Sequence, residues 1–177
     1  MKGFTLTEII IVIGIITVLS LMAIVYSHTG ERQITLFQEQ MKVLNALSRA
    51  KSLSINTFNQ PDVPCGFGVH FDESDNSFRI FKEQASKQDC SNMDLKYTDA
   101  LENFDVSDPN KEKFILSKSV DFVGVMAFED IIFYPPEPTV IISPGFQDEA
   151  IIGLKIIGST QPPVIIKVNK LGMITTQ

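Results

Sequence analysis

The sequence predicts an α+β fold, in which one long N-terminal helix precedes a domain of short antiparallel strands. Residues 9–26 carry fifteen apolar side chains in eighteen. Residues 31–56 repeat apolar side chains every three or four positions, as an amphipathic helix does. The expected stripe consists of Ile34, Phe37, Met41 and Leu44, widened by Leu36, Val43, Leu47 and Ala50. Residues 66–177 alternate short apolar runs with turn-forming residues. The chain has 177 residues, of which 44% are hydrophobic and 20% charged, and this composition excludes a disordered chain, a disulfide-packed toxin and a multi-span membrane protein.

Hydropathy and charge are both unevenly distributed along the chain. The mean hydropathy of +0.13 comes from the apolar run, and the remaining residues average about −0.2 on the same scale. No charged residue lies between Glu8 and Glu31, and the formal net charge is −6. An acidic domain is repelled by phosphate backbones, so we do not expect nucleic-acid binding.

The apolar run is the first element. As a helix, 18 residues extend about 27 Å, close to the hydrocarbon thickness of a bilayer. A secretory signal peptide cleaved near Val25-Tyr26-Ser27, a plain signal anchor and a buried core helix are the ordinary interpretations. None of them explains Glu8, because a carboxylate at the membrane costs a few kcal/mol unless it is paired.

The N-terminal motif resembles a known family. Lys2-Gly3, then Phe4-Thr5-Leu6-Thr7-Glu8 and a long Ile/Val run resemble the class III leader and first helix of type IV pilins and type II secretion pseudopilins. The resemblance implies cleavage between Gly3 and Phe4 by a prepilin peptidase and methylation of the new Phe4 amine. It divides the chain into a leader (1–3), a transmembrane and filament-core helix (4–30) and a soluble pilin-like domain (31–177).

The resemblance also implies partners and a location. The partners are other pilin or pseudopilin subunits, a prepilin peptidase and methyltransferase, an assembly platform protein and an ATPase motor. The precursor would cross the inner membrane once with its domain outside the cytoplasm, and the assembled filament would lie at the cell surface. Unlike many pilins, this chain has no proline near the end of its apolar stretch.

Glu8 has a physical role in this interpretation. After cleavage, the Phe4 amine would be a cation one helical turn from Glu8. In a stack of parallel helices, Glu8 of one subunit can neutralise the amine of another and so set the axial register. The alternatives are a solvated carboxylate, or one that satisfies its own amine or the helix N-terminus.

The second half of the helix and the strands follow in order. We expect one helix from about Phe4 to Asn56, bent at Gly30, with two helices joined at Gly30 as the alternative. A β-hairpin is expected at 67–71 and 78–81, followed by a long polar loop at 84–112. Turns are expected at 135–138 and 162–163. Further short strands are expected at 114–116, 120–122, 131–133, 140–142, 151–157, 164–168 and 173–175, giving seven to nine in all.

A weaker resemblance covers most of the chain. The long helix, the Gly66-Phe67-Gly68-Val69 strand and the late strand 164–169 are similar to the H-type minor pseudopilins and the FimT-like pilins. Some pilins of that class take up DNA through basic residues near the C-terminus. Only Lys167 and Lys170 are available here, so we do not transfer that property.

Cys65 and Cys90 are the two cysteines. If the resemblance holds, both lie outside the cytoplasm, where a disulfide is favoured. The alternative is a pair of free structural thiols. A catalytic cysteine is less favoured, because only His28 and His70 could activate it and His28 lies next to the membrane segment.

Other functional motifs are weak. Asp72-Glu73-Ser74-Asp75-Asn76 with Glu83 resembles a calcium loop superficially, but position six is Ser77 rather than Gly, so we interpret the run as a hairpin turn. Major pseudopilins often hold calcium in a C-terminal loop that no run here matches, so no metal ligand or cofactor is assigned. We expect a structural filament subunit rather than an enzyme. The alternative function is a membrane-anchored extracytoplasmic binding domain.

Overall fold

The structure is a computed structural model of the chain. It describes residues 3–57, 64–83, 90, 93–98, 102–105, 107–108, 110–123, 127–135, 139–145 and 147–177, with the backbone alone for 24–29 and 57. Met1, Lys2, the side chain of His28, much of the expected loop at 84–112 and most of the expected turn at 135–138 lie outside the described residues. The chain divides into two compact units, Met1–Thr35 and Leu36–Gln177, which are described separately below.

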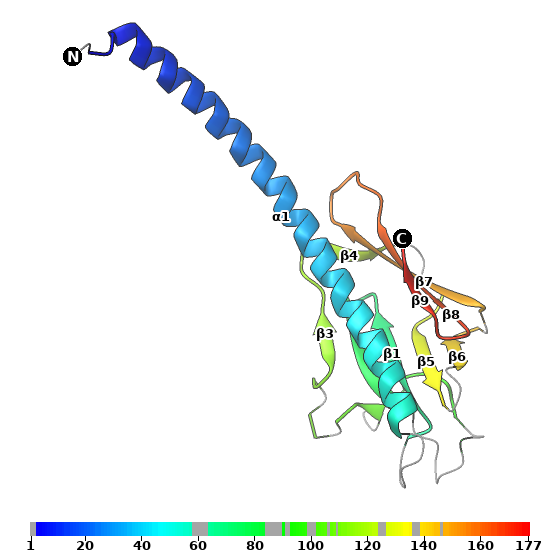
Figure 1. Ribbon diagram of the computed structural model, residues 1–177. Coiled ribbons are helices and arrows are strands. Elements are labelled where there is room, and N and C mark those ends of the chain that lie inside the picture. Colours follow the sequence, from blue (N-terminus) through cyan, green and yellow to red (C-terminus); the bar gives the residue numbers. More distant parts are fainter. Residues whose placement is uncertain are drawn as a thin grey trace. The chain divides into compact units, whose positions relative to one another are not determined.

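One α-helix contributes to both units. Helix α1 comprises Leu6–Thr57, 52 residues, and its backbone is helical without interruption through Gly30 (Figure 1). The expected single helix is therefore present, and the alternative of two helices joined at Gly30 is wrong. The expected bend at Gly30 and the domain boundary near residue 30 stay predictions.

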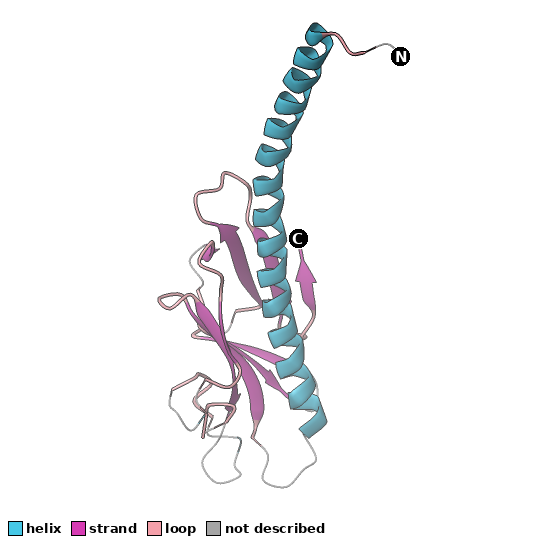
Figure 2. Ribbon diagram, turned by 90° about the vertical axis from the view of Figure 1, so that its left-hand side faces the viewer, coloured by secondary structure: helices cyan, strands magenta, loops and turns pink. Residues whose placement is uncertain are grey.

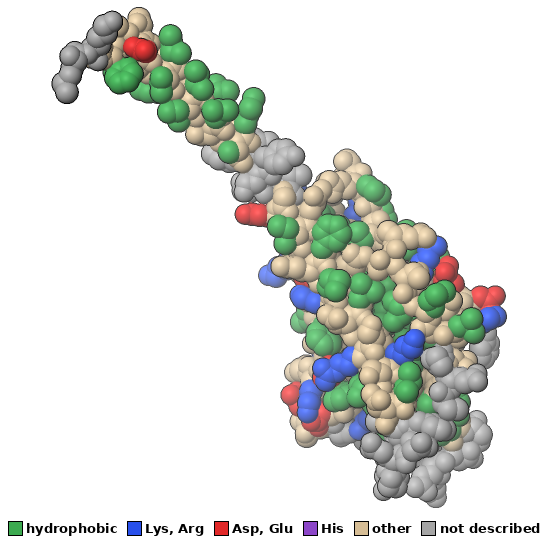
Figure 3. Space-filling view, in the orientation of Figure 1, with side chains coloured by type: hydrophobic (Ala, Val, Ile, Leu, Met, Phe, Trp, Pro, Cys, Tyr) green, Lys and Arg blue, Asp and Glu red, His purple; other side chains and the backbone are tan. Residues whose placement is uncertain are grey.

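The first unit exposes its apolar side chains. Leu6–Ala23 is a span of 18 residues with a mean hydropathy of 2.5 and no buried residue. Figure 3 shows hydrophobic side chains on the face of this segment that is in view. The span is long and apolar enough to cross a membrane, although a signal sequence has the same properties.

The second unit buries one stripe of α1 against β-strands. Val43, Leu47 and Ala50 are completely buried, and their spacing of three and four residues places them on one helix face. Ser54 continues this stripe and donates a hydrogen bond of 2.6 Å to the Phe133 carbonyl. The amphipathic pattern therefore predicted the packed face only in part, because the expected stripe also contained Ile34, Phe37 and Met41, which are each more than half exposed. The buried face includes the polar Glu39 and Gln40 instead, so apolar periodicity alone misplaced its centre.

Two antiparallel sheets complete the second unit (Figure 2). The five-stranded sheet has the order β3-β2-β1-β5-β6, and the four-stranded sheet has the order β4-β7-β8-β9. The expected strands are thus present as β1 (Gly66–Asp72), β2 (Ser77–Glu83), β3 (Lys113–Ile115), β4 (Val120–Val123), β5 (Asp130–Tyr134), β6 (Thr139–Ser143), β7 (Glu149–Ile156), β8 (Val164–Asn169) and β9 (Ile174–Thr176).

The strands β1 and β2 form the expected hairpin. Asp72 pairs with Ser77 next to the turn, and Gly66 pairs with Glu83 at the open end. Gly68 is required in β1, because a Cβ built there would lie 2.5 Å from the Phe81 ring and 3.0 Å from the Ile131 carbonyl oxygen.

Phenylalanine rings join the two sheets in the core. Phe71 of β1 meets Phe122 of β4 edge to face, with ring centroids 5.9 Å apart. It meets Phe128 in the same way at 6.0 Å. Edge-to-face pairs of this kind contribute about 0.5–1.5 kcal/mol beyond their buried area, so the rings help to hold β1 against β4.

Candidate functional site

The N-terminus of α1 carries the residues that the sequence singled out. The helix begins at Leu6, two residues later than expected, because Thr5 acts as its N-cap. The Glu8 amide donates to Thr5 Oγ1 at 3.3 Å, and the Thr5 amide donates to Glu8 Oε2 at 3.4 Å. This reciprocal pair has the pattern of a capping box.

Glu8 is therefore satisfied by the helix N-terminus in the single chain. This is one of the alternatives that the sequence left open, and the pairing with another subunit's amine stays a prediction. Both bonds lie near the long limit for a hydrogen bond, and they are exposed to solvent. The Glu8 carboxylate can exchange these contacts for a stronger cationic partner at little cost.

Gly3 and Phe4 lie just outside the helix. Phe4 is 81% exposed, and together with Glu8, Ile9, Val12 and Ile13 it lines a shallow apolar groove of about 220 Å³. A Cβ built at Gly3 would meet no atom within 4 Å. The fold therefore gives no steric reason for glycine at position 3.

The predicted disulfide is present between Cys65 and Cys90, with their Cα atoms 5.6 Å apart. Cys65 lies next to the open end of the hairpin, where its amide donates to the Glu83 carbonyl at 2.9 Å. The disulfide consequently attaches the segment after β2 to the end of β1.

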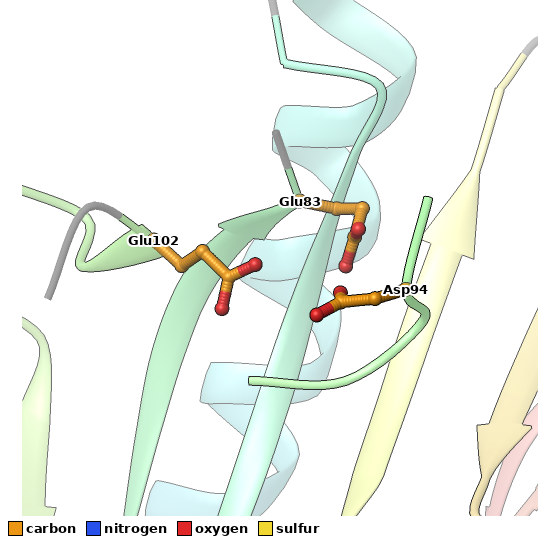
Figure 4. A group of neighbouring side chains, drawn as sticks. All are labelled: Glu83, Asp94 and Glu102. Carbon is orange, nitrogen blue, oxygen red and sulfur yellow. The ribbon is translucent and has the colours of Figure 1, made fainter. Parts of the chain in front are cut away.

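Three carboxyl groups meet near this disulfide. Glu83 ends β2, whereas Asp94 and Glu102 belong to the polar segment that follows, and one oxygen atom from each lies within 4.8 Å of the other two. Figure 4 shows the three carboxyl groups turned toward a common space. Burial raises the pKa of Glu83 to about 7, and the Glu102 and Asp94 carboxylates act in the same direction.

Sequence reasoning missed this cluster. Asp94 follows Glu83 by eleven residues, and Glu102 follows Asp94 by eight. The polar segment that contains Asp94 and Glu102 has no helical or strand periodicity that would place them beside the end of β2. The only sequence signal was the pair of cysteines, because a Cys65–Cys90 bond returns the segment before Asp94 to the end of the hairpin.

A second buried acid lies on the neighbouring strand. Asp130 of β5 forms a hydrogen bond with His70, with 2.8 Å between Asp130 Oδ1 and His70 Nδ1. The centroids of the His70 and Tyr97 rings are 4.9 Å apart. Burial raises the pKa of Asp130, while the hydrogen bond with His70 opposes that change. His70 also lines an open pocket of about 430 Å³ with Glu73 and Glu129.

The remaining candidates have ordinary structural roles. Asp72 Oδ1 accepts from the amides of Ser74 and Asp75 at 3.0 and 3.2 Å, which confirms the interpretation of 72–76 as a hairpin turn. Lys170 pairs with Asp148 at 2.6 Å, and Lys167 lies 4.0 Å from Glu149. Nucleic-acid binding is not tested by these contacts.

No protein-family model, no curated protein and no solved structure matches the chain. The fold and the site therefore stand on the residues described above: an α+β architecture, an exposed apolar N-terminal span and a disulfide. These features are compatible with a pilin, and the function is treated as a proposal below.

Proposed function

We propose that this chain is a prepilin, the precursor of a structural subunit of a type IV pilus or a type II secretion pseudopilus. A prepilin peptidase cleaves it between Gly3 and Phe4, the new Phe4 amine is methylated, and the apolar helices of many subunits pack into a filament core. The subunit is held in the inner membrane before assembly, with its domain outside the cytoplasm.

The observation that carries the proposal is the exposed apolar helix surface. Eleven large apolar side chains between Ile9 and Met22 are each at least half exposed. Burying a side chain of this size contributes about 1.5–3 kcal/mol, so the segment leaves on the order of 10 kcal/mol or more unrealised in the single chain. Lipid before assembly and neighbouring helices after it would both supply that burial.

The continuity of α1 favours a retained helix over a secretory signal peptide. The best signal-peptide cleavage position, Val25-Tyr26-Ser27, lies within the unbroken helical backbone of α1. Cleavage there would cut the helix in its interior. Cleavage after Gly3 would leave α1 intact, because the helix begins three residues later, at Leu6.

The unneutralised charge of Glu8 in the apolar segment supports assembly into an open filament. Within residues 4–30, Glu8 carries the single acidic side chain, and no Lys or Arg lies there to neutralise it. A Phe4 amine from a neighbouring subunit would do so. Pairing between unlike surfaces of identical chains is heterologous, and a heterologous contact that does not close produces a helical filament.

The N-terminus of the mature chain tests this function. The chain is produced in a host with a prepilin peptidase, and its N-terminal peptide is analysed by mass spectrometry. We expect methylated Phe4. Intact Met1 would favour the membrane-anchored binding domain, and a start at His28 would favour a secreted protein; either result would contradict the proposal.

A pair of glycine variants separates recognition from folding. Gly3→Val places a branched side chain at the cleavage position, and we expect the Met1–Gly3 leader to be retained. Gly14→Ala is the matched control, because a Cβ at Gly14 also meets no atom within 4 Å, and its leader should be removed normally. Equal processing of both variants would contradict cleavage after Gly3.

A further inference from the structure

We propose that Glu83, Asp94 and Glu102 form a calcium site that fastens the segment after β2 to the end of the hairpin. All three ligands are carboxylates, and hard cations such as Ca²⁺ and Mg²⁺ prefer oxygen ligands. The ligands come from the last residue of β2 and from the segment that connects β2 to β3. They are therefore distinct from the C-terminal loop in which major pseudopilins often hold calcium. The site is independent of the proposed filament function.

Glu83 provides the strongest indication that a cation binds at this cluster. Its side chain is completely buried, and neither carboxylate oxygen has a hydrogen-bond partner among the described residues. The Leu95 amide and the Asp94 carboxyl approach it closely enough to affect its pKa, but not with the geometry of an ordinary hydrogen bond. A buried carboxylate without a partner is costly, so such groups are usually paired or coordinate a metal.

Among the described residues, no Lys or Arg forms an ion pair with Glu83 or Asp94. Arg79, on the same strand as Glu83, donates hydrogen bonds to Tyr97 Oη at 2.9 Å and Asn103 Oδ1 at 3.2 Å. A bound cation would therefore relieve the mutual repulsion of the three carboxylates.

The chemistry of the ligands indicates which cation fits. The three oxygens lie within 4.8 Å of one another, a spacing that one Ca²⁺ ion can bridge with bonds of about 2.3–2.6 Å. Ca²⁺ accepts irregular coordination by carboxylates, whereas Mg²⁺ demands near-ideal octahedral geometry and retains several waters. The cluster contains no His or Cys, which Zn²⁺ would favour.

The surrounding contacts hold the ligands in place before a cation binds. The Cys65–Cys90 bond fixes the start of the segment that follows β2. Near the end of that segment, Asn103 forms an isolated antiparallel β-bridge with Phe81 of β2. Between them, the Thr98 amide donates to Glu102 Oε2 at 2.6 Å, and the Thr98 hydroxyl donates to Asp94 Oδ2 at 3.1 Å. The three carboxylates therefore converge through contacts that a cation does not have to create.

Calcium titration of the full chain in detergent micelles tests the site. We expect one Ca²⁺ per chain by isothermal titration calorimetry, with a Kd of about 10⁻³ M or tighter. Mg²⁺ should bind at least about tenfold more weakly, because it demands shorter bonds. Thermal unfolding, followed by tyrosine fluorescence, should shift upward with Ca²⁺ and return with a chelator.

Variants assign the binding to these residues. Glu83→Gln and Asp94→Asn should each weaken Ca²⁺ binding by at least about tenfold, whereas the exposed Asp121→Asn on β4 is the matched control and should bind normally. Asp94 is itself exposed, so Asp94→Asn keeps the test valid if Glu83→Gln misfolds. Unchanged affinity in Asp94→Asn, or no Ca²⁺ response of the parent chain at about 10 mM, would overturn the proposal.

Discussion

The apolar span Leu6–Ala23 and the domain from Leu36 onward differ in how far they bury the same types of side chain. Ile13 on the apolar span is 57% exposed, whereas Ile131 in β5 is completely buried. Ile131 lies between neighbouring strands of one chain, but no residue of the span Leu6–Ala23 is buried by the part of the chain that the structure describes. The difference shows that the domain buries its apolar side chains against its own strands, while those of the span stay exposed; under the proposed function, lipid or neighbouring subunits would cover them.

Removing the Glu8 charge should cause the largest effect, on assembly. We expect Glu8→Ala to be cleaved normally but to assemble poorly, because loss of one partner from a buried ion pair costs about 3–5 kcal/mol. Filament yield by sedimentation and leader removal by mass spectrometry measure the two steps separately.

Thr5→Ala is the control for this variant. It removes the helix cap, which is worth about 1 kcal/mol, and keeps the carboxylate. Normal filaments from Glu8→Ala, or equal loss of filaments in Thr5→Ala, would contradict a role for the Glu8 charge in subunit pairing.

A matched pair of core substitutions tests the comparison directly. Ile131→Ala should lower the free energy of unfolding of the domain by about 2–5 kcal/mol, because it opens a cavity in a packed core. Ile13→Ala should change the same quantity by less than about 0.5 kcal/mol. Urea unfolding of both variants in micelles measures these values, and a large effect of Ile13→Ala would show that the span takes part in domain folding.

Loss of the disulfide should have the next largest effect. Replacing Cys65 and Cys90 together by Ser removes a link between residues 25 apart, which in the chain-entropy model lowers the free energy of unfolding by about 3 kcal/mol. Urea unfolding of the double variant and of the parent under oxidising conditions measures this difference, and reduction of the parent should abolish it. Equal stability of parent and variant under oxidising conditions would show that the bond adds nothing to the domain.

Ionisation of Glu83 should make the free energy of unfolding depend on pH, with a smaller effect than loss of the disulfide. Its pKa is raised from 4.5 to about 7 in the folded chain, so the folded state binds this proton more tightly than the unfolded state. The associated stability is full below about pH 4.5 and is lost as the pH rises to about 7, which lowers the free energy of unfolding by about 2 kcal/mol. Urea unfolding at pH 4.5 and pH 7 with a chelator present measures it.

Glu83→Gln should remove most of this decrease, because glutamine has no proton to lose. Glu73→Gln at the hairpin turn is the control, and it should retain the decrease. A slope that persists in Glu83→Gln would assign the pH effect to another group, such as Asp130 with His70.

Most of the domain could be predicted from local patterns. The strands β1 and β2 alternate around an Asp- and Ser-rich turn, and the turn contacts of Asp72 follow from its own side chain. The packed face of α1 was predicted only in part, because Val43, Leu47 and Ala50 of the expected stripe are buried while Ile34, Phe37 and Met41 are exposed. These features depend on residues that are close in sequence, so periodicity reports them well.

The apolar span, the motif around Glu8 and the cysteine pair were determined by the sequence alone, because each depends on residue type and short spacing. The division of the strands into two sheets and the meeting of Glu83, Asp94 and Glu102 were decided by the tertiary structure. Glu83 and Glu102 are 19 residues apart, and long-range pairing and a disulfide bring them together. Contacts of this kind leave no periodic trace in the sequence, because chain reversals in irregular segments set them.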